Sequence, residues 1–159
     1  GEEQNPPTAV SFYVNALPDS SLLIKPCSTS VLLGGEFTIQ VTVKQLENLM
    51  AAKVSLNFSS DLLEIVQNGI VEGEFLTRNG GQVVLLDSVL NSQGKVEIDL
   101  GIAESTPPGV SGSGTLAVIT FEAKKKGVAS IYFESYELRD TNNESIKINK
   151  TRDGKVSIE

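Results

Sequence analysis

The sequence predicts an all-β protein: a nine-stranded antiparallel β-sandwich with jelly-roll topology. Short runs rich in Val, Ile, Leu, Thr and Phe alternate with clusters of Gly, Asn, Asp and Ser from Leu22 onward. Apolar and polar residues alternate within these runs, and a helical period is nowhere sustained. The chain has 159 residues, of which 40% are hydrophobic, and this is enough for one compact domain.

We expect nine strands, separated by turns that contain Gly, Asn or Asp. In residues 36–43 every second residue from Phe37 is apolar, so one side of this strand packs and the other meets water. Two sheets packed on these apolar sides would gain roughly 1.5–3 kcal/mol for each large side chain that they bury. The expected strands are residues 22–25, 36–43, 52–58, 63–71, 82–89, 95–102, 114–123, 128–134 and 155–158.

The chain divides into a short N-terminal segment and one domain. Residues 1–20 hold three prolines and several charges around the apolar run 9–14, which indicates a linker or one added edge strand. Residues 21–159 carry the regular strand pattern and form the β-sandwich domain.

Composition excludes several classes of function. With 13 basic and 20 acidic residues the net charge is -7, which argues against nucleic acid and anionic membrane surfaces as partners. No apolar run approaches the ~20 residues of a membrane helix, so we expect no membrane insertion by this segment. Histidine is absent and Cys27 is the single cysteine, so the commonest general base, zinc sites and internal disulfides are excluded. We therefore expect neither a zinc site nor a Ser/His/Asp catalytic triad.

The run 114–123 is unusual because both of its sides hold apolar residues. The alternation predicts that Ile119 and Phe121 face a core and that Leu116 and Val118 lie on the outer side of the strand. Outward aliphatic side chains on a strand suggest a protein partner more than a small substrate.

Several segments in order resemble a cohesin module, the β-sandwich receptor of dockerin domains in cellulosomes and related surface assemblies. They cover about residues 22–159, and their pattern departs from the type I members. The segments are LLIKPCSTSVLLGGEFTIQVTV, FSSDLLEIV, KVEIDLGIAES, GVSGSGTLAVITFEAKKKG and LRDTNNESIKI.

This resemblance implies a non-catalytic module that binds a dockerin-like domain and lies outside the cell or on its surface. Calcium is expected on the dockerin partner and not on this chain. Association with polysaccharide through the parent protein, and self-association, are left open.

The resemblance also implies a binding face, built by residues 52–58, 82–89, 95–102 and 114–123. Its outward residues are Ala51, Lys53, Ser55, Asn57, Glu97, Asp99, Gly101, Leu116, Val118 and Thr120.

Two details of this face bear on specificity. Ala51 and Lys53 align with an Asn and an Asp that accept dockerin hydrogen bonds in type I cohesins, so that acceptor pair is missing here. Glu104 aligns with an acidic interface residue of type I members. The resemblance thus implies dockerin-like binding of different specificity, or none.

Other interpretations start from polar and aromatic side chains. A carbohydrate-binding module would need Tyr13, Tyr132 and Tyr136 on one face, because the chain has no Trp. Asp87 and Asp99 could act as an acid and base only if their carboxylates met in a cleft. A purely architectural module is the remaining alternative.

One loop has oxygen-bearing side chains at calcium-loop spacing. Asp140, Asn142 and Glu144 alternate, but Ser145 stands where a calcium loop needs Gly, and Thr151 replaces the bidentate Glu. We interpret this segment as a polar hairpin loop.

Overall fold

A computed structural model describes residues 19–103 and 109–159, and the described part is built almost wholly of strands. A single 3-10 turn (Asn91–Gln93) is the only helical element among these residues. The strands are β1 (Ser21–Lys25), β2 (Ser28–Val31), β3 (Glu36–Phe58), β4 (Leu63–Glu72), β5 (Val83–Leu90), β6 (Lys95–Ile102), β7 (Val110–Ala123), β8 (Gly127–Asp140), β9 (Lys150–Arg152) and β10 (Gly154–Ile158).

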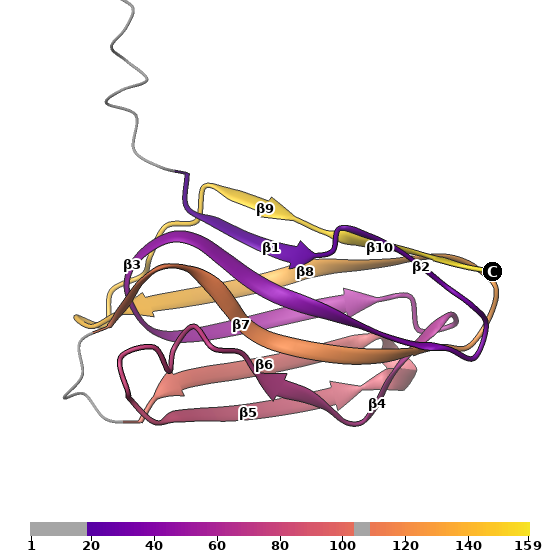
Figure 1. Ribbon diagram of the computed structural model, residues 1–159, viewed down its shortest axis with the longest axis horizontal. Coiled ribbons are helices and arrows are strands. Elements are labelled where there is room, and N and C mark those ends of the chain that lie inside the picture. Colours follow the sequence, from indigo (N-terminus) through magenta and orange to yellow (C-terminus); the bar gives the residue numbers. More distant parts are fainter. Residues whose placement is uncertain (1–18, 104–108) are drawn as a thin grey trace, which may run out of the picture.

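The strands form two packed layers, and the long strand β3 belongs to both (Figure 1). The first layer has the order β5–β6–β3–β8–β10–β2 and the second has the order β4–β7–β3–β1–β9. Between its two legs β3 turns back at Gln45 and Asn48, which both have positive φ. Their backbone N–H groups donate to the hydroxyl oxygens of Ser113 and Ser111 on β7, so side chains replace the ladder bonds at this bend.

The expected all-β sandwich is confirmed, and the strand list needs three corrections. Residues 36–43 and 52–58 belong to one bent strand. The short polar strands β2 and β9 went unpredicted because they lack an apolar alternation. Two of the pairings, β1 with β9 and β10 with β2, are parallel. The expectation for residues 1–20 falls almost entirely outside the described residues.

The core lies between the layers and centres on aromatic packing around Phe121. Its ring stacks on Phe37 with centroids 5.6 Å apart and meets the edge of Phe58 at 5.2 Å. The loop between β4 and β5 adds Phe75 and Leu76, which are 0% and 3% exposed, so this loop closes one end of the sandwich.

Strand β7 corrects the expected orientation of Leu116. The pairing with β3 shifts by one residue, from Val41 opposite Ala117 to Thr42 opposite Thr115, so Leu116 is the extra residue of a β-bulge. A bulge breaks the two-residue alternation, and both Leu116 and Ala117 point into the core, with 2% and 1% exposure.

Candidate binding face

The outer side of the first layer carries a regular array of side chains, four from each of four strands. The array follows from the antiparallel registers of β5 with β6, β6 with β3 and β3 with β8. We call it the β5–β6–β3–β8 face. Its rows are Val84–Gly101–Ala51–Arg139, Leu86–Asp99–Lys53–Glu137, Ser88–Glu97–Ser55–Ser135 and Leu90–Lys95–Asn57–Tyr132.

One margin of this face is aliphatic. Val84, Leu86 and Leu90 on β5 are 49%, 65% and 47% exposed. The row beside Val84 continues into Gly101, which has no side chain, and Ala51, which has only a methyl group. Aliphatic side chains that stand together on a sheet mark a surface suited to a protein partner.

Charged side chains lie in every row of the face. Lys95 pairs with Glu134 at 3.4 Å, and Arg139 pairs with Glu137 at 2.9 Å. Lys53 lies between the strand positions of Asp99 and Glu137 and forms no ion pair with a described residue.

Ser55 and Asn57 contact neighbouring strands of the face through their side chains. Ser55 Oγ donates to Glu97 Oε2 at 3.4 Å, and Asn57 Nδ2 lies 3.5 Å from the Tyr132 hydroxyl. Ser55 is 7% exposed, so it supports the surface more than it contributes contact area. Lys53, between the positions of Asp99 and Glu137, therefore offers a hydrogen-bond donor near the middle of the face.

The structure unites seven of the predicted site residues and separates the others. The seven on this face are Ala51, Lys53, Ser55, Asn57, Glu97, Asp99 and Gly101. Val118 and Thr120 lie on β7 in the second layer, opposite Gln40 and Thr38. Leu116 is in the core, and Glu104 lies outside the described residues.

The fourth strand of the face is β8 and not β7, which is the main correction to the predicted site. β8 contributes Tyr132, Ser135, Glu137 and Arg139. Residues 128–134 were expected to form a strand, but β8 continues to Asp140, so Ser135, Glu137 and Arg139 lie beyond its expected end. Alternation also does not tell which strand they border. Only the three-dimensional pairing with β3 brings them to the face.

The alternative sites do not assemble. Asp99 lies opposite Leu86 on the outer face, whereas Asp87 lies opposite the buried Ile98, so the two carboxylates are on different sides of the sheet. Tyr132 lies opposite Asn57 on the outer face, whereas Tyr136 lies opposite the buried Val54, so the two tyrosines are on different sides of the sheet. Tyr13 lies outside the described residues.

The loop that resembled a calcium site is closed by its own hydrogen bonds. The Asp140 carboxylate accepts from the backbone N–H groups of Asn142 at 2.8 Å and Glu144 at 3.0 Å. This agrees with a polar hairpin loop. Across residues 19–103 and 109–159 no group of three or more Cys, Asp or Glu side chains is placed to hold a metal ion.

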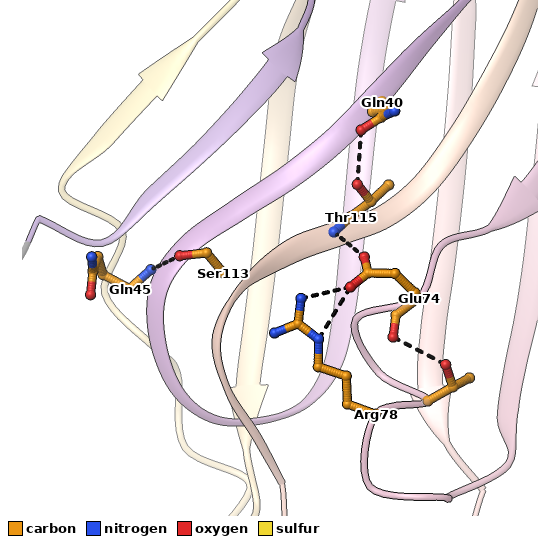
Figure 2. Close-up of polar contacts among 7 residues, drawn as sticks. Gln40, Gln45, Glu74, Arg78, Ser113 and Thr115 are labelled. Carbon is orange, nitrogen blue, oxygen red and sulfur yellow. Dashed lines mark hydrogen bonds and ion pairs between the residues drawn. The ribbon is translucent and has the colours of Figure 1, made fainter.

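A second polar cluster fixes the β4–β5 loop to β7 (Figure 2). The Glu74 carboxylate accepts from the Thr115 backbone N–H at 2.7 Å and from Arg78 Nη2 at 2.6 Å, and the Thr115 hydroxyl donates to Gln40 at 2.9 Å. Partial burial alone would raise the pKa of Glu74, but the bond from Thr115 and the hydrogen bond and charge of Arg78 outweigh it and hold the pKa below its ordinary value. Sequence alternation gave no signal of this cluster, because it joins a loop to a bulge.

Fold and site together define a β-sandwich module with a broad sheet face open to a partner. The family model described as Cohesin domain matches residues 25–158, so the chain belongs to the cohesin domain family. Comparison with curated proteins finds no match. Among the described residues no helix is long and apolar enough to cross a membrane.

Solved cohesins share the fold at low sequence identity. The sixth cohesin of Acetivibrio cellulolyticus scaffoldin B, solved with a mutant Cel5 dockerin, aligns with a TM-score of 0.73 and 16% identity, covering 89% of this chain and 100% of that one. A non-cellulosomal cohesin from the archaeon Archaeoglobus fulgidus gives 0.67 and 17%, covering 89% and 92%. The OlpA cohesin of Clostridium thermocellum, solved in a type I complex with a dockerin, gives 0.73 and 15%, covering 89% and 100%.

Proposed function

We propose that this chain is a non-catalytic receptor module that binds a dockerin-like domain through its β5–β6–β3–β8 face, in an extracellular or cell-surface assembly. The observation that carries the proposal is the aliphatic margin of Val84, Leu86 and Leu90 beside a charged centre, on a member of the cohesin family. Related cohesins have been solved in complex with dockerins, which supports the class of partner.

The face has the composition of a protein interface. Apolar side chains at one margin can be buried, while charged groups around Lys53 set orientation and specificity. A standard interface buries about 800 Å² on each partner, an area that a four-stranded face with long side chains can supply.

Lys53 points to the chemistry of the partner. Its ammonium group donates hydrogen bonds and cannot accept them, and no described residue pairs with it. The complementary dockerin surface offers a carboxylate or backbone carbonyl groups at this point. Type I dockerins, which meet acceptors at the aligned positions, are then poorer partners than dockerins with an acidic contact surface.

Charge reversal at the centre of the face tests the proposal. A panel of calcium-loaded dockerin domains, including ones with acidic contact surfaces, is titrated calorimetrically against the chain. Lys53→Glu should weaken the best binder at least tenfold, equivalent to about 1.4 kcal/mol. The matched control is Lys25→Glu, an exposed lysine opposite Gln40 on the second layer, and it should leave affinity unchanged.

Three results would overturn parts of this proposal. Loss of binding in Lys25→Glu but not in Lys53→Glu would move the site to the second layer, and Val118→Asp would then test the strand that alternation had favoured. Binding that survives chelation of calcium would exclude a calcium-organised partner. Failure of every dockerin in the panel to bind would remove the dockerin as the partner.

A further inference from the structure

Strand β5 is an edge strand of unusual composition. It pairs with β6 and with no other described strand, through eight residues without a register shift. Its sequence, VVLLDSVL, holds one charge, Asp87, and neither Pro nor Gly. Leu86 at its middle is 65% exposed. Long, regular, apolar edges of this kind are open templates for another strand.

The backbone groups on the open side of β5 can be assigned from the ladder. The Ala103 N–H donates to the Gln82 carbonyl at 2.7 Å, and the Phe58 N–H donates to the Gly94 carbonyl at 2.8 Å. Antiparallel hydrogen bonds alternate along a strand, so the even-numbered residues of β5 bond to β6. The N–H and C=O groups of the odd-numbered residues, 83 to 89, therefore point away from the sheet, and no described residue bonds to them.

The other sheet edges in the described part of the chain are protected. β4 has a register shift between Ile65 and Ile70, with Asn68 at positive φ in between. β9 has three residues, of which Lys150 and Arg152 are charged, and β2 has four residues. Bulges, charges and short length are the usual means of preventing strand addition, and β5 has only one charge.

We infer that β5 pairs with β5 of a second copy of this chain, antiparallel across a two-fold axis, joining two first layers into one continuous sheet. A second copy fits because β5 complements itself. With Leu86 opposite the partner's Leu86, Val83 lies opposite the partner's Val89 and Val84 opposite the partner's Ser88. A shift of two residues in one direction would place Asp87 opposite the partner's Asp87, and like charges in direct opposition disfavour it. A shift of two residues in the other direction would pair only residues 83–87 of β5, instead of residues 83–89.

Hydrogen bonding is consistent with this register. Leu86 is a residue whose backbone bonds to β6, so its pair across the axis is non-hydrogen-bonded, with Cα atoms about 4.5 Å apart. The outward-directed groups of Leu85 meet those of the partner's Asp87. Each pairing is isologous, so the assembly closes as a dimer.

The contact is small and each chain carries a charge of -7. A single strand edge buries less than a standard interface, so we expect dimers at high micromolar concentration. Salt screens the repulsion between the two acidic copies, and the dimer fraction should rise with ionic strength.

Cysteine cross-linking tests the register directly. In a Cys27→Ser background, Leu86→Cys should form a disulfide dimer under mild oxidation, because the two Cα atoms lie within disulfide range. Val84→Cys is the matched control, since the two copies of residue 84 lie four residues apart along the pair, about 13 Å. Equal cross-linking of both variants, or of neither, would overturn the proposed register.

Sedimentation equilibrium tests the edge without changing the binding face. Asp87→Pro removes an N–H that points away from β6, so the β5–β6 ladder survives and self-association should fall at least tenfold. If this variant unfolds, Asp87→Lys places a charge at the same edge and should have the same effect. A wild-type chain that stays monomeric at millimolar concentration in high salt would refute the dimer. Lys53→Glu should still dimerise, so this inference and the dockerin proposal fail separately.

Discussion

The β5–β6–β3 region and the β3–β7–β4 region are built from similar alternating strands, yet they differ in regularity. The pairings of β5 with β6 and of β6 with β3 run without a register shift. The pairing of β3 with β7 shifts three times, and that of β7 with β4 shifts once. The β5–β6–β3 region is therefore a plain ladder, whereas bulges repeatedly change the direction of side chains in the β3–β7–β4 region.

This difference determines where a side chain points. In the plain ladder, parity places residues correctly on one face or the other, as for Asp99 outside and Ile98 inside. In the bulged region, adjacent residues Leu116 and Ala117 both enter the core, and the β4–β5 loop bonds to the bulge through the Gly73 N–H and the Leu116 carbonyl at 2.8 Å. The bulged region therefore owes part of its stability to a loop.

The largest expected effect distinguishes Leu116, which the bulge turns into the core, from Leu86 on the exposed side of the plain ladder. Leu116→Ala should lower the free energy of unfolding by about 2–5 kcal/mol, because it empties a core position. Leu86→Ala, at a 65% exposed position of the ladder, should change it by less than about 0.5 kcal/mol. Urea denaturation of both variants makes the comparison, and similar losses would mean that Leu116 is not a core residue.

Much of the fold could be predicted because the core residues mark their own strands. Phe37, Ile39 and Val41 specify an inward side through alternation alone. Most expected strand boundaries fall close to the observed ones, but β7 begins at Val110 and not at residue 114, and β8 ends at Asp140 and not at residue 134. Strand order is different, because it depends on which edges meet in three dimensions. The position of β8 beside β3, and the bend of β3 at Gln45 and Asn48, leave no periodic trace in the sequence.

The candidate site, like the fold, could be predicted only in part. The positions on β3 and β6, such as Lys53 and Asp99, follow from parity and from the family resemblance. Leu116 was misplaced because a bulge inserts one residue and reverses parity beyond it. The aliphatic margin at Leu86 was not predicted although its strand was expected, because β5 carries apolar residues on both of its sides and alternation does not tell them apart.

Two glycines sharpen the comparison at a smaller scale. A Cβ added at Gly73 would overlap the Thr115 carbonyl oxygen and its neighbours, whereas one at Gly101 would meet only Ala51 Cβ at 3.8 Å. Gly73→Ala should therefore cost about 1–3 kcal/mol through displaced backbone. Gly101→Ala should be neutral or stabilising by about 0.5 kcal/mol, since Gly weakens a strand interior. Thermal unfolding of the pair measures this, and a stable Gly73→Ala would show that the loop is free to move off β7.

The smallest effect concerns the charge that joins the loop to the bulge. The pKa of Glu74 is lower in the folded state than its ordinary value of 4.5, so its ionisation stabilises the fold at any pH above that value, and this contribution disappears as the pH falls through the folded pKa.

Glu74→Gln should consequently lower stability by about 0.5–1 kcal/mol at pH 7, a modest amount because the carboxylate is 57% exposed. The difference from wild type should shrink below pH 4.5 and nearly vanish once the pH is well below the folded pKa of Glu74, where the wild-type carboxyl is protonated as well. Urea denaturation of both proteins at pH 7, 4.5 and 3 follows this difference. A gap that stayed constant or widened in acid would mean that the charge of Glu74 does not stabilise the loop, and that hydrogen bonds and packing hold it on β7.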